Sequence, residues 1–76
     1  MNKTECQAMM KEIENGLYAI PNIEIVDYVT VGENGEVYAG VDVRDGLPEK
    51  EEQETLILVS DVILQVQVDH GVKERK

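Results

Sequence analysis

The chain has 76 residues and a formal net charge of -9, with 42% hydrophobic and 30% charged residues. This length predicts a single small domain, residues 1–76, with a modest core, because a chain of this size buries only about 60% of its unfolded surface. The one cysteine excludes an internal disulfide, and no apolar run approaches the roughly 20 residues that a bilayer span needs.

The negative charge is concentrated in the middle of the chain. Residues 12–54 contain twelve acids and two bases, whereas the segments on either side are almost neutral. A folded domain with such a region repels nucleic acid and attracts basic surfaces, so direct nucleic-acid binding is disfavoured. No apolar leader is visible at the start, and with one cysteine this favours a cytoplasmic location.

The first segment is predicted to be a helix over residues 4–15. Thr4 is a suitable N-cap, and Gln7 completes a capping-box pattern. Gly16 is a natural stop signal, and Pro21 requires an extended backbone before it. The residues that recur at helical spacing and define the apolar face are Cys6, Met9 or Met10, Ile13 and Leu17.

Residues 23–31 and 36–44 are predicted to form a β-hairpin, because both are rich in β-branched residues and a short polar segment separates them. A two-residue loop would place acids directly opposite acids, which is unfavourable. A three-residue loop with Gly35 in the left-handed conformation instead pairs Val31 with Val37. This register also places Glu24 opposite Arg44, so we expect the three-residue loop.

That register predicts two different faces for the hairpin. The apolar face contains Ile23, Ile25, Val29, Val31, Val37, Ala39, Val41 and Val43. The other face contains Glu24, Val26, Tyr28, Thr30, Glu36, Tyr38, Gly40, Asp42 and Arg44. Asp27 falls on the apolar face, and a β-bulge at this residue would turn its side chain outward.

The second half of the chain begins with a turn at Asp45, Gly46 and Pro48. The acidic run 49–54 is too polar for a core and fits a solvated loop or the first turn of a helix. Residues 55–59 are predicted to be a third strand. Residues 62–68 alternate with period two, which favours a fourth strand, although the residues around them would also suit a helix. Residues 73–76 are expected to be a frayed tail.

These elements predict an α+β fold, with an N-terminal helix packed on a small antiparallel sheet of three or four strands. The alternative is an α-β-β-β-α order in which the last segment is helical. Residues 62–68 contain neither charge nor proline. As an edge strand they would be poorly protected, so a homodimer through this sheet edge is expected.

The sequence contains no catalytic, cofactor-binding or metal-binding motif. Zinc would need more Cys and His ligands than Cys6 and His70 can provide. His70 is expected in a surface turn, and Cys6 is expected to be a small core residue. We therefore expect a protein that is not an enzyme and needs neither cofactor nor metal.

The acidic hairpin, with two tyrosines as aromatic anchors, predicts a protein-interaction module that binds a basic partner surface. The residues expected to contact the partner are Glu24, Tyr28, Glu36, Tyr38 and Asp42. One alternative is an acidic inhibitor that mimics nucleic acid, as a phage protein directed against host or defence functions would. Another is a small ligand-binding or enzymatic subunit whose site forms only in an oligomer.

Overall fold

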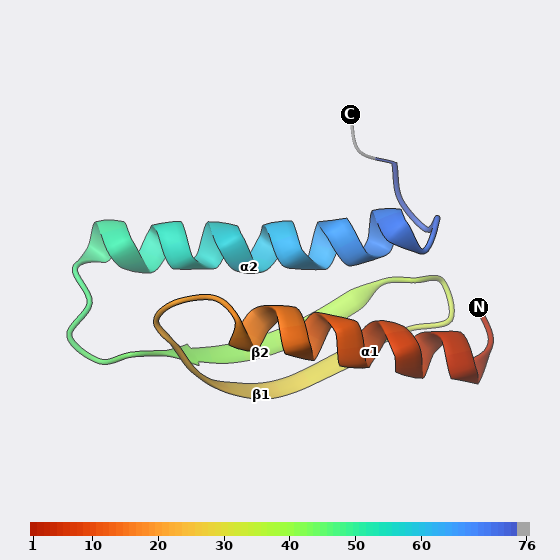
Figure 1. The fold of residues 1–76 in the computed structure, drawn as a ribbon, viewed down its shortest axis with the longest axis horizontal. Helices are drawn as coiled ribbons and strands as arrows, with labels where there is room; N and C mark the ends of the chain where they lie inside the picture. The colour runs from red at the N-terminus through yellow and green to blue at the C-terminus, as the bar shows by residue number, and fades with distance from the viewer. Residues whose placement is uncertain (75–76) are drawn as a thin grey trace.

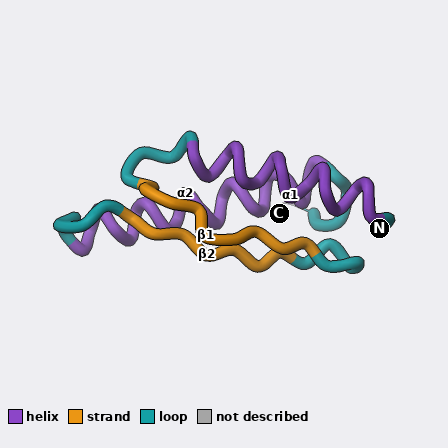
Figure 2. Tube along the Cα trace, turned by 90° about the horizontal axis from the view of Figure 1, so that it is seen from below, coloured by secondary structure: helices purple, strands orange, loops and turns teal. Residues whose placement is uncertain are grey.

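A computed structural model describes residues 1–74 of the chain and has the element order α-β-β-α. The elements are α1 (Lys3–Tyr18), β1 (Ile23–Val31), β2 (Val37–Val43) and α2 (Glu49–Asp69). β1 and β2 form a two-stranded antiparallel sheet. α1 lies across one face of this hairpin and α2 runs beside α1 along the β2 side (Figure 1). Seen from below, the strands lie on the opposite side of the molecule from α1 (Figure 2), so one face of the hairpin is uncovered.

The predicted α+β class and the N-terminal helix on an antiparallel sheet are confirmed, but the sheet has two strands, not three or four. Residues 55–59 and 62–68 are not strands, because both belong to the single helix α2. The α-β-β-β-α alternative is right about the helical end and wrong about a third strand. Residues 62–68 therefore offer no strand edge, so the structural basis of the expected edge-to-edge homodimer is wrong, and dimerisation itself stays a prediction.

α2 is a helix because the helical conformation gathers four of its side chains on one face, which packs against the rest of the molecule. Four of its residues recur at spacings of four, three and four, and all face the rest of the molecule: Thr55, Val59, Val62 and Val66. β-Branched residues weaken a helix by only a few tenths of a kcal/mol each, and burial of such a stripe easily exceeds that cost. Buried Thr55 satisfies its hydroxyl by donating to the Glu51 carbonyl at 2.8 Å.

α1 is longer than predicted at both ends. Its N-cap is Asn2, whose side-chain oxygen accepts a hydrogen bond from the Glu5 backbone N–H at 2.8 Å, so Thr4 lies inside the helix. The helix also continues through Gly16 to Tyr18, although Gly16 was expected to end it. A β-carbon on Gly16 would lie 2.7 Å from Cγ1 of Val62. The absence of a side chain at Gly16 therefore lets α2 pack closely against α1, and Gly16 does not end α1.

The core is built mainly on one face of α1. Met9, Ile13 and Leu17 are fully buried, and four further buried apolar residues surround them: Ile20, Val29, Val31 and Val66. Burial of a side chain of this size stabilises the fold by about 1.5–3 kcal/mol. The core therefore lies between α1 and the inner face of the hairpin, with α2 closing one side.

The hairpin loop has the predicted three residues. Gly35 has a φ of +83°, and its N–H donates to the Gly32 carbonyl at 2.9 Å. The Gly32 N–H donates to the Glu36 carbonyl at 2.9 Å, and Val31 pairs with Val37 as expected. The buried Gln67 side chain donates to the Gly35 carbonyl at 3.0 Å, which ties α2 to this loop.

The hairpin contains two irregularities where one bulge was expected. The register shifts between Val26 and Tyr28, which confirms the bulge at Asp27, and shifts again between Ile23 and Ile25. Beyond the second shift Ile23 pairs with Val43, so the predicted pairing of Glu24 with Arg44 is wrong. The bulge at Asp27 turns Ile25 outward and Val26 inward, the reverse of the expectation, and the second bulge returns Ile23 to the inner face.

Within residues 1–74, no helix combines the length and the apolar composition that a bilayer crossing requires. Of the expected tail at 73–76, Lys73 and Glu74 follow α2 as exposed residues outside any helix or strand. Residues 75–76 lie outside the described part of the chain.

Candidate partner-binding surface

The uncovered side of the hairpin, called the open face below, is defined by strand pairing. The pairs Val31–Val37, Val29–Ala39 and Val26–Val41 point inward, so the pairs that alternate with them along the hairpin point outward. The residues of the open face are Ile25, Tyr28, Thr30, Tyr38, Gly40 and Asp42. Its large apolar side chains are well exposed: 48% for Ile25, 55% for Tyr28 and 61% for Tyr38.

Tyr28 is held in place by a glycine on the neighbouring strand. Gly40 is the direct partner of Tyr28, and a β-carbon on Gly40 would overlap the Tyr28 ring. The ring therefore lies across the sheet instead of extending freely into water. Tyr38 pairs with Thr30, one step along the sheet, so the two tyrosines are diagonal neighbours about 7–8 Å apart. The two tyrosines, called the aromatic pair below, share the centre of the open face, and the Tyr28 ring lies over Gly40.

Four exposed carboxylates surround this aromatic pair. Glu24 and Asp27 lie at the two bulges of β1, Asp42 is on the open face, and Glu36 sits beside the loop with its carboxylate against Gly32. In the described part of the chain, none of these four forms an ion pair with a basic side chain. Their charge is therefore free to act on an approaching partner, with little screening at distances shorter than about 8 Å.

All five residues predicted to contact a partner are exposed, and Tyr28, Tyr38 and Asp42 share the open face. Glu36 and Glu24 lie at its two ends. Ile25, which was assigned to the core, and Asp27 were not among these five residues. The signal for both was the acid at Asp27 that interrupts the apolar alternation of β1, because a bulge there also turns Ile25 outward.

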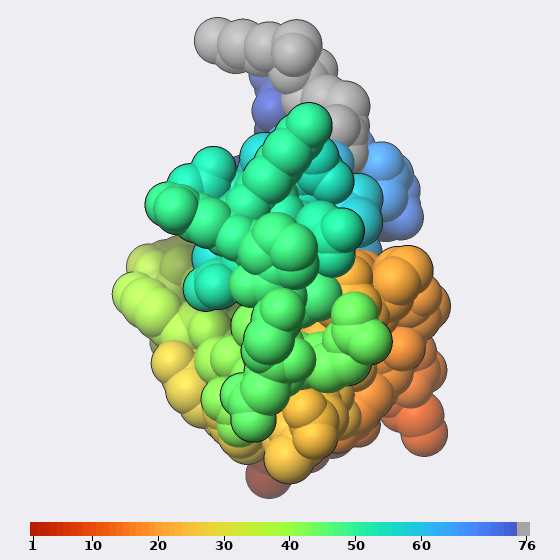
Figure 3. All heavy atoms as spheres, turned by 90° about the vertical axis from the view of Figure 1, so that its left-hand side faces the viewer, coloured from red at the N-terminus to blue at the C-terminus, as the bar shows by residue number. Residues whose placement is uncertain are grey.

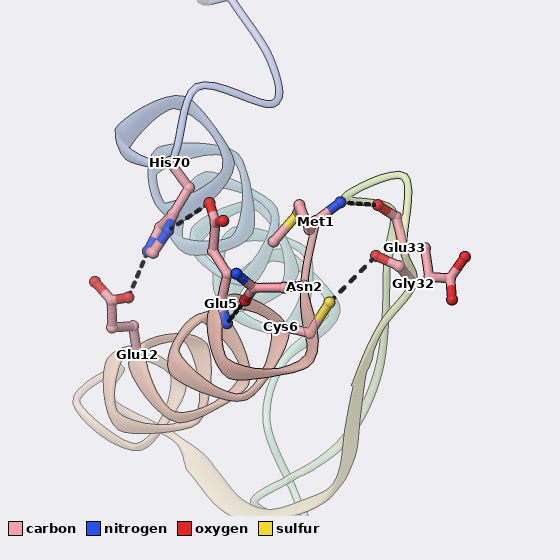
Figure 4. A network of polar contacts seen from close by, with 8 residues as sticks. All are labelled: Met1, Asn2, Glu5, Cys6, Glu12, Gly32, Glu33 and His70. Carbon is pink, nitrogen blue, oxygen red and sulfur yellow. Dashed lines mark hydrogen bonds and ion pairs between the residues drawn. The ribbon is translucent and has the colours of Figure 1, made fainter.

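A second polar cluster ties the two helices together at the end of the molecule that carries the hairpin loop (Figure 4). His70, the C-cap of α2, places its Nε2 2.5 Å from Oε2 of Glu12 and its Nδ1 3.9 Å from Oε2 of Glu5. The His70 side chain is only 19% exposed, so it is not the open turn residue that was expected. Nearby, the amino group of Met1 donates to the Glu33 carbonyl at 2.9 Å. This cluster fastens α1 to the end of α2 and to the hairpin loop.

Cys6 lies in the same region and packs against the core, as expected. Its side chain is half-buried and its thiol donates to the Gly32 carbonyl at 3.7 Å. Among residues 1–74, no three His, Cys, Asp or Glu side chains are placed so that they could hold a metal ion. The His70 cluster is therefore best described as a structural contact.

Two surface hollows accompany these features. One, of about 280 Å³, lies between the hairpin loop and α2 and includes Tyr38, Gln67 and Lys73. The other, of about 300 Å³, lies between α1 and β1. Both are at the lower limit for small-molecule sites, but the first extends the open face at Tyr38. Comparison with protein-family models, curated proteins and solved structures finds no match for the chain.

Proposed function

We propose that this chain is a non-enzymatic interaction module whose open face binds a basic surface of a partner protein. The observation that carries the proposal is an exposed tyrosine pair, ringed by unpaired carboxylates, on a face that neither helix covers. A reducing cytoplasm is the compartment that suits a chain with a single cysteine.

The two kinds of side chain have different tasks in such a complex. The carboxylates increase the rate of encounter with a positive surface, and this effect weakens with salt. Tyrosine is enriched among the residues that dominate binding energy, because it buries a large rigid area and loses little conformational freedom. Tyr28 loses even less than usual, since Gly40 already restricts its ring.

The apolar centre of the open face also favours a protein partner over mimicry of nucleic acid. A mimic of a phosphate backbone needs carboxylates along its contact surface, whereas here Ile25, Tyr28 and Tyr38 occupy the middle. Rings at the centre with charges around them match the usual arrangement of a protein interface, with an apolar core and a polar rim.

The proposal can be tested by capturing partners from an extract of the source cells on immobilised protein. We expect a basic protein to be retained at low salt and released at high salt. Glu36→Lys with Asp42→Lys, and separately Tyr28→Ser with Tyr38→Ser, should abolish retention. The matched control is Glu54→Lys with Glu74→Lys, which changes the net charge equally at exposed positions away from the open face.

Equal retention by the wild type and both open-face variants would refute the proposal. Each variant is first checked by circular dichroism, so that a loss of binding is not caused by unfolding. A short DNA duplex added as competitor separates the two binding hypotheses. Displacement by the duplex, under conditions where heparin of equal charge displaces nothing, would identify a nucleic-acid-binding protein and favour mimicry.

A further inference from the structure

The outer edge of β1, called the free edge below, has no neighbouring strand in the described part of the chain. α2 runs along the β2 side of the hairpin, so β1 is the strand on the side away from α2 (Figure 1). Figure 3, viewed from the start of α2, shows the same arrangement, with yellow residues of β1 along the lower side of the molecule and α2 above the hairpin. A two-stranded sheet is marginally stable by itself, and an open strand edge readily accepts a further strand.

Strand pairing shows which main-chain groups point to the free edge. The Gly32 N–H donates to the Glu36 carbonyl at 2.9 Å, so these two residues form a hydrogen-bonded pair. Such pairs alternate along an antiparallel ladder with pairs that exchange no hydrogen bonds, so the N–H and C=O groups of Val31 and Val29 point away from β2. Within residues 1–74, no other group bonds to them. Each valine is only 8% exposed, and buried main-chain groups without partners are rare in proteins.

The main-chain groups on both sides of these two valines already have partners. The Val26 N–H donates to the Tyr18 hydroxyl at 3.3 Å, and the Glu33 carbonyl accepts a hydrogen bond from the amino group of Met1 at 2.9 Å. The unpaired stretch of the free edge is therefore short and has defined ends. It can accept a strand of only a few residues.

The hollow between α1 and β1 lies beside this unpaired stretch. It has a volume of about 300 Å³ and is lined by Val29 and by four residues of α1: Gln7, Met10, Lys11 and Glu14. The Val29 side chain points inward, so a residue paired with Val29 on an added strand would also point its side chain inward. That side chain would enter the hollow, whereas the next one along the strand would extend the open face.

We propose that the free edge binds a short extended segment of the partner protein, which adds a third strand to the sheet. Its apolar side chains point to the hollow and its basic side chains lie on the open-face side. Main-chain pairing at a strand edge, with pockets for alternate side chains, is a general mode of peptide recognition. Basic side chains fit because the exposed acids Asp27 and Glu33 stand at the two ends of the unpaired stretch. The inference rests on the proposed function for the charge of the partner.

A second copy of the chain does not fit the free edge. Two β1 strands paired antiparallel across a two-fold axis would carry their α1 helices on the same side of the sheet. α1 packs mainly on β1, and neighbouring strands lie about 4.8 Å apart, whereas packed helices need about 8–10 Å. The two helices would therefore overlap, and the acids at the two edges would repel each other. The added strand must come from a segment that carries no helix on that side.

The first test uses a peptide probe, Lys-Val-Lys-Leu-Lys-Val-Lys, and follows the amide resonances of the protein by NMR. We expect the Val29 and Val31 amides to shift and to exchange more slowly with solvent, because they gain hydrogen-bond partners. The matched control is the same peptide with N-methyl groups on its valines and leucine. Its charge and side chains are unchanged, but it lacks the N–H groups that would face the free edge. Its dissociation constant should be roughly tenfold higher or more.

The second test fills the hollow. Gln7→Trp places a large ring there and should weaken binding of the unmethylated peptide roughly tenfold. Ala8→Trp is the matched control, because Ala8 is exposed on the same helix but does not line the hollow, and it should bind like the wild type. A peptide that shifts no amide resonance at millimolar concentration overturns the inference, and so does equal binding of the methylated peptide. If Gln7→Trp unfolds the chain, the comparison of the two peptides decides.

Failure of this inference can be distinguished from failure of the proposed function by repeating the capture experiment with Gln7→Trp. A basic protein retained equally by the wild type and by Gln7→Trp, but lost by the open-face variants, would overturn pairing at the free edge and leave open-face binding intact. Retention that survives the open-face substitutions would instead refute the proposed function. In that case, loss of retention by Gln7→Trp but not by Ala8→Trp would still support the free edge.

Discussion

Gly35 shows how one residue is constrained twice, by its own backbone and by a distant segment. Its φ of +83° disfavours any β-carbon, and a β-carbon there would lie 2.7 Å from Cβ of Val72. Gly35→Ala should therefore lower the free energy of unfolding by more than the roughly 1 kcal/mol expected for the backbone conformation alone. Urea denaturation measures this change.

The chain contains a matched control for this prediction. Gly46 has the same φ of +83°, but nothing lies within 4 Å of a β-carbon built on it. Gly46→Ala should show the conformational cost alone, about 1 kcal/mol. Equal losses for the two variants would mean that the Val72 contact contributes nothing. Combining Gly35→Ala with Val72→Ala should recover only part of the difference, because the Cβ atom of residue 72 remains at 2.7 Å.

The contact between Glu12 and His70 also belongs to the residue scale. His70 is mostly buried and Glu12 is half-exposed, so we expect a coupling of about 0.5–1 kcal/mol between them. The check is a double-mutant cycle with Glu12→Gln and His70→Ala, measured by thermal unfolding at constant pH. If the stability losses of the two single variants add up to the loss of the double variant, Glu12 and His70 lie close together but their contact does not stabilise the fold.

At the scale of the elements, Gly16 marks a close approach between α1 and α2. In an isolated helix, Gly→Ala stabilises by about 1 kcal/mol, but here the new methyl group would collide with the branched side chain of Val62. We therefore expect Gly16→Ala to destabilise the wild type. In a Val62→Ala background the same change should stabilise. Chemical denaturation of the four variants checks this reversal, and a gain in both backgrounds would contradict it.

The elements differ in how well local sequence predicts them. The hairpin loop and the pairing of Val31 with Val37 could be predicted, because they depend on Gly35 and on local repulsion between acids. The position of Ile25 was predicted wrongly although a bulge at Asp27 was considered, because a bulge exchanges the faces of every residue beyond it. The Asp27 bulge alone turns Ile25 out of the core, and the second bulge, at Glu24, turns Ile23 back in.

α2 could not be assigned from local pattern for a different reason. Over residues 62–68 the side chains alternate with period two, and the same residues also place Val62 and Val66 on one helical face. Which pattern prevails depends on the surface available for burial. That surface is formed by α1, beside Gly16, and by the hairpin, which are distant from α2 in the sequence and therefore do not enter its local pattern. The candidate surface was easier to predict, because polar and aromatic residues on a short hairpin remain exposed in either register.

At the scale of the whole molecule, the arrangement of charge predicts the kinetics of binding. Glu36→Lys with Asp42→Lys reverses two charges beside the tyrosine pair, and both residues are exposed, so stability should change little. The association rate with the captured partner should fall more than the dissociation rate rises, and the difference should shrink at high salt. Surface plasmon resonance at two salt concentrations measures both rates. An association rate unaffected by both the reversal and the salt would contradict electrostatic steering.

The placement of the tyrosines also makes the molecule its own optical probe. The chain has three tyrosines and no tryptophan, so nothing masks phenol absorbance and emission in the near ultraviolet. Tyr28 and Tyr38 lie on the open face, and the Tyr18 hydroxyl accepts a hydrogen bond from the Val26 backbone N–H at the edge of β1. Every phenol in the molecule therefore lies on or beside the hairpin. A ligand without aromatic residues that covers this sheet would change the protein's intrinsic spectrum without any attached dye.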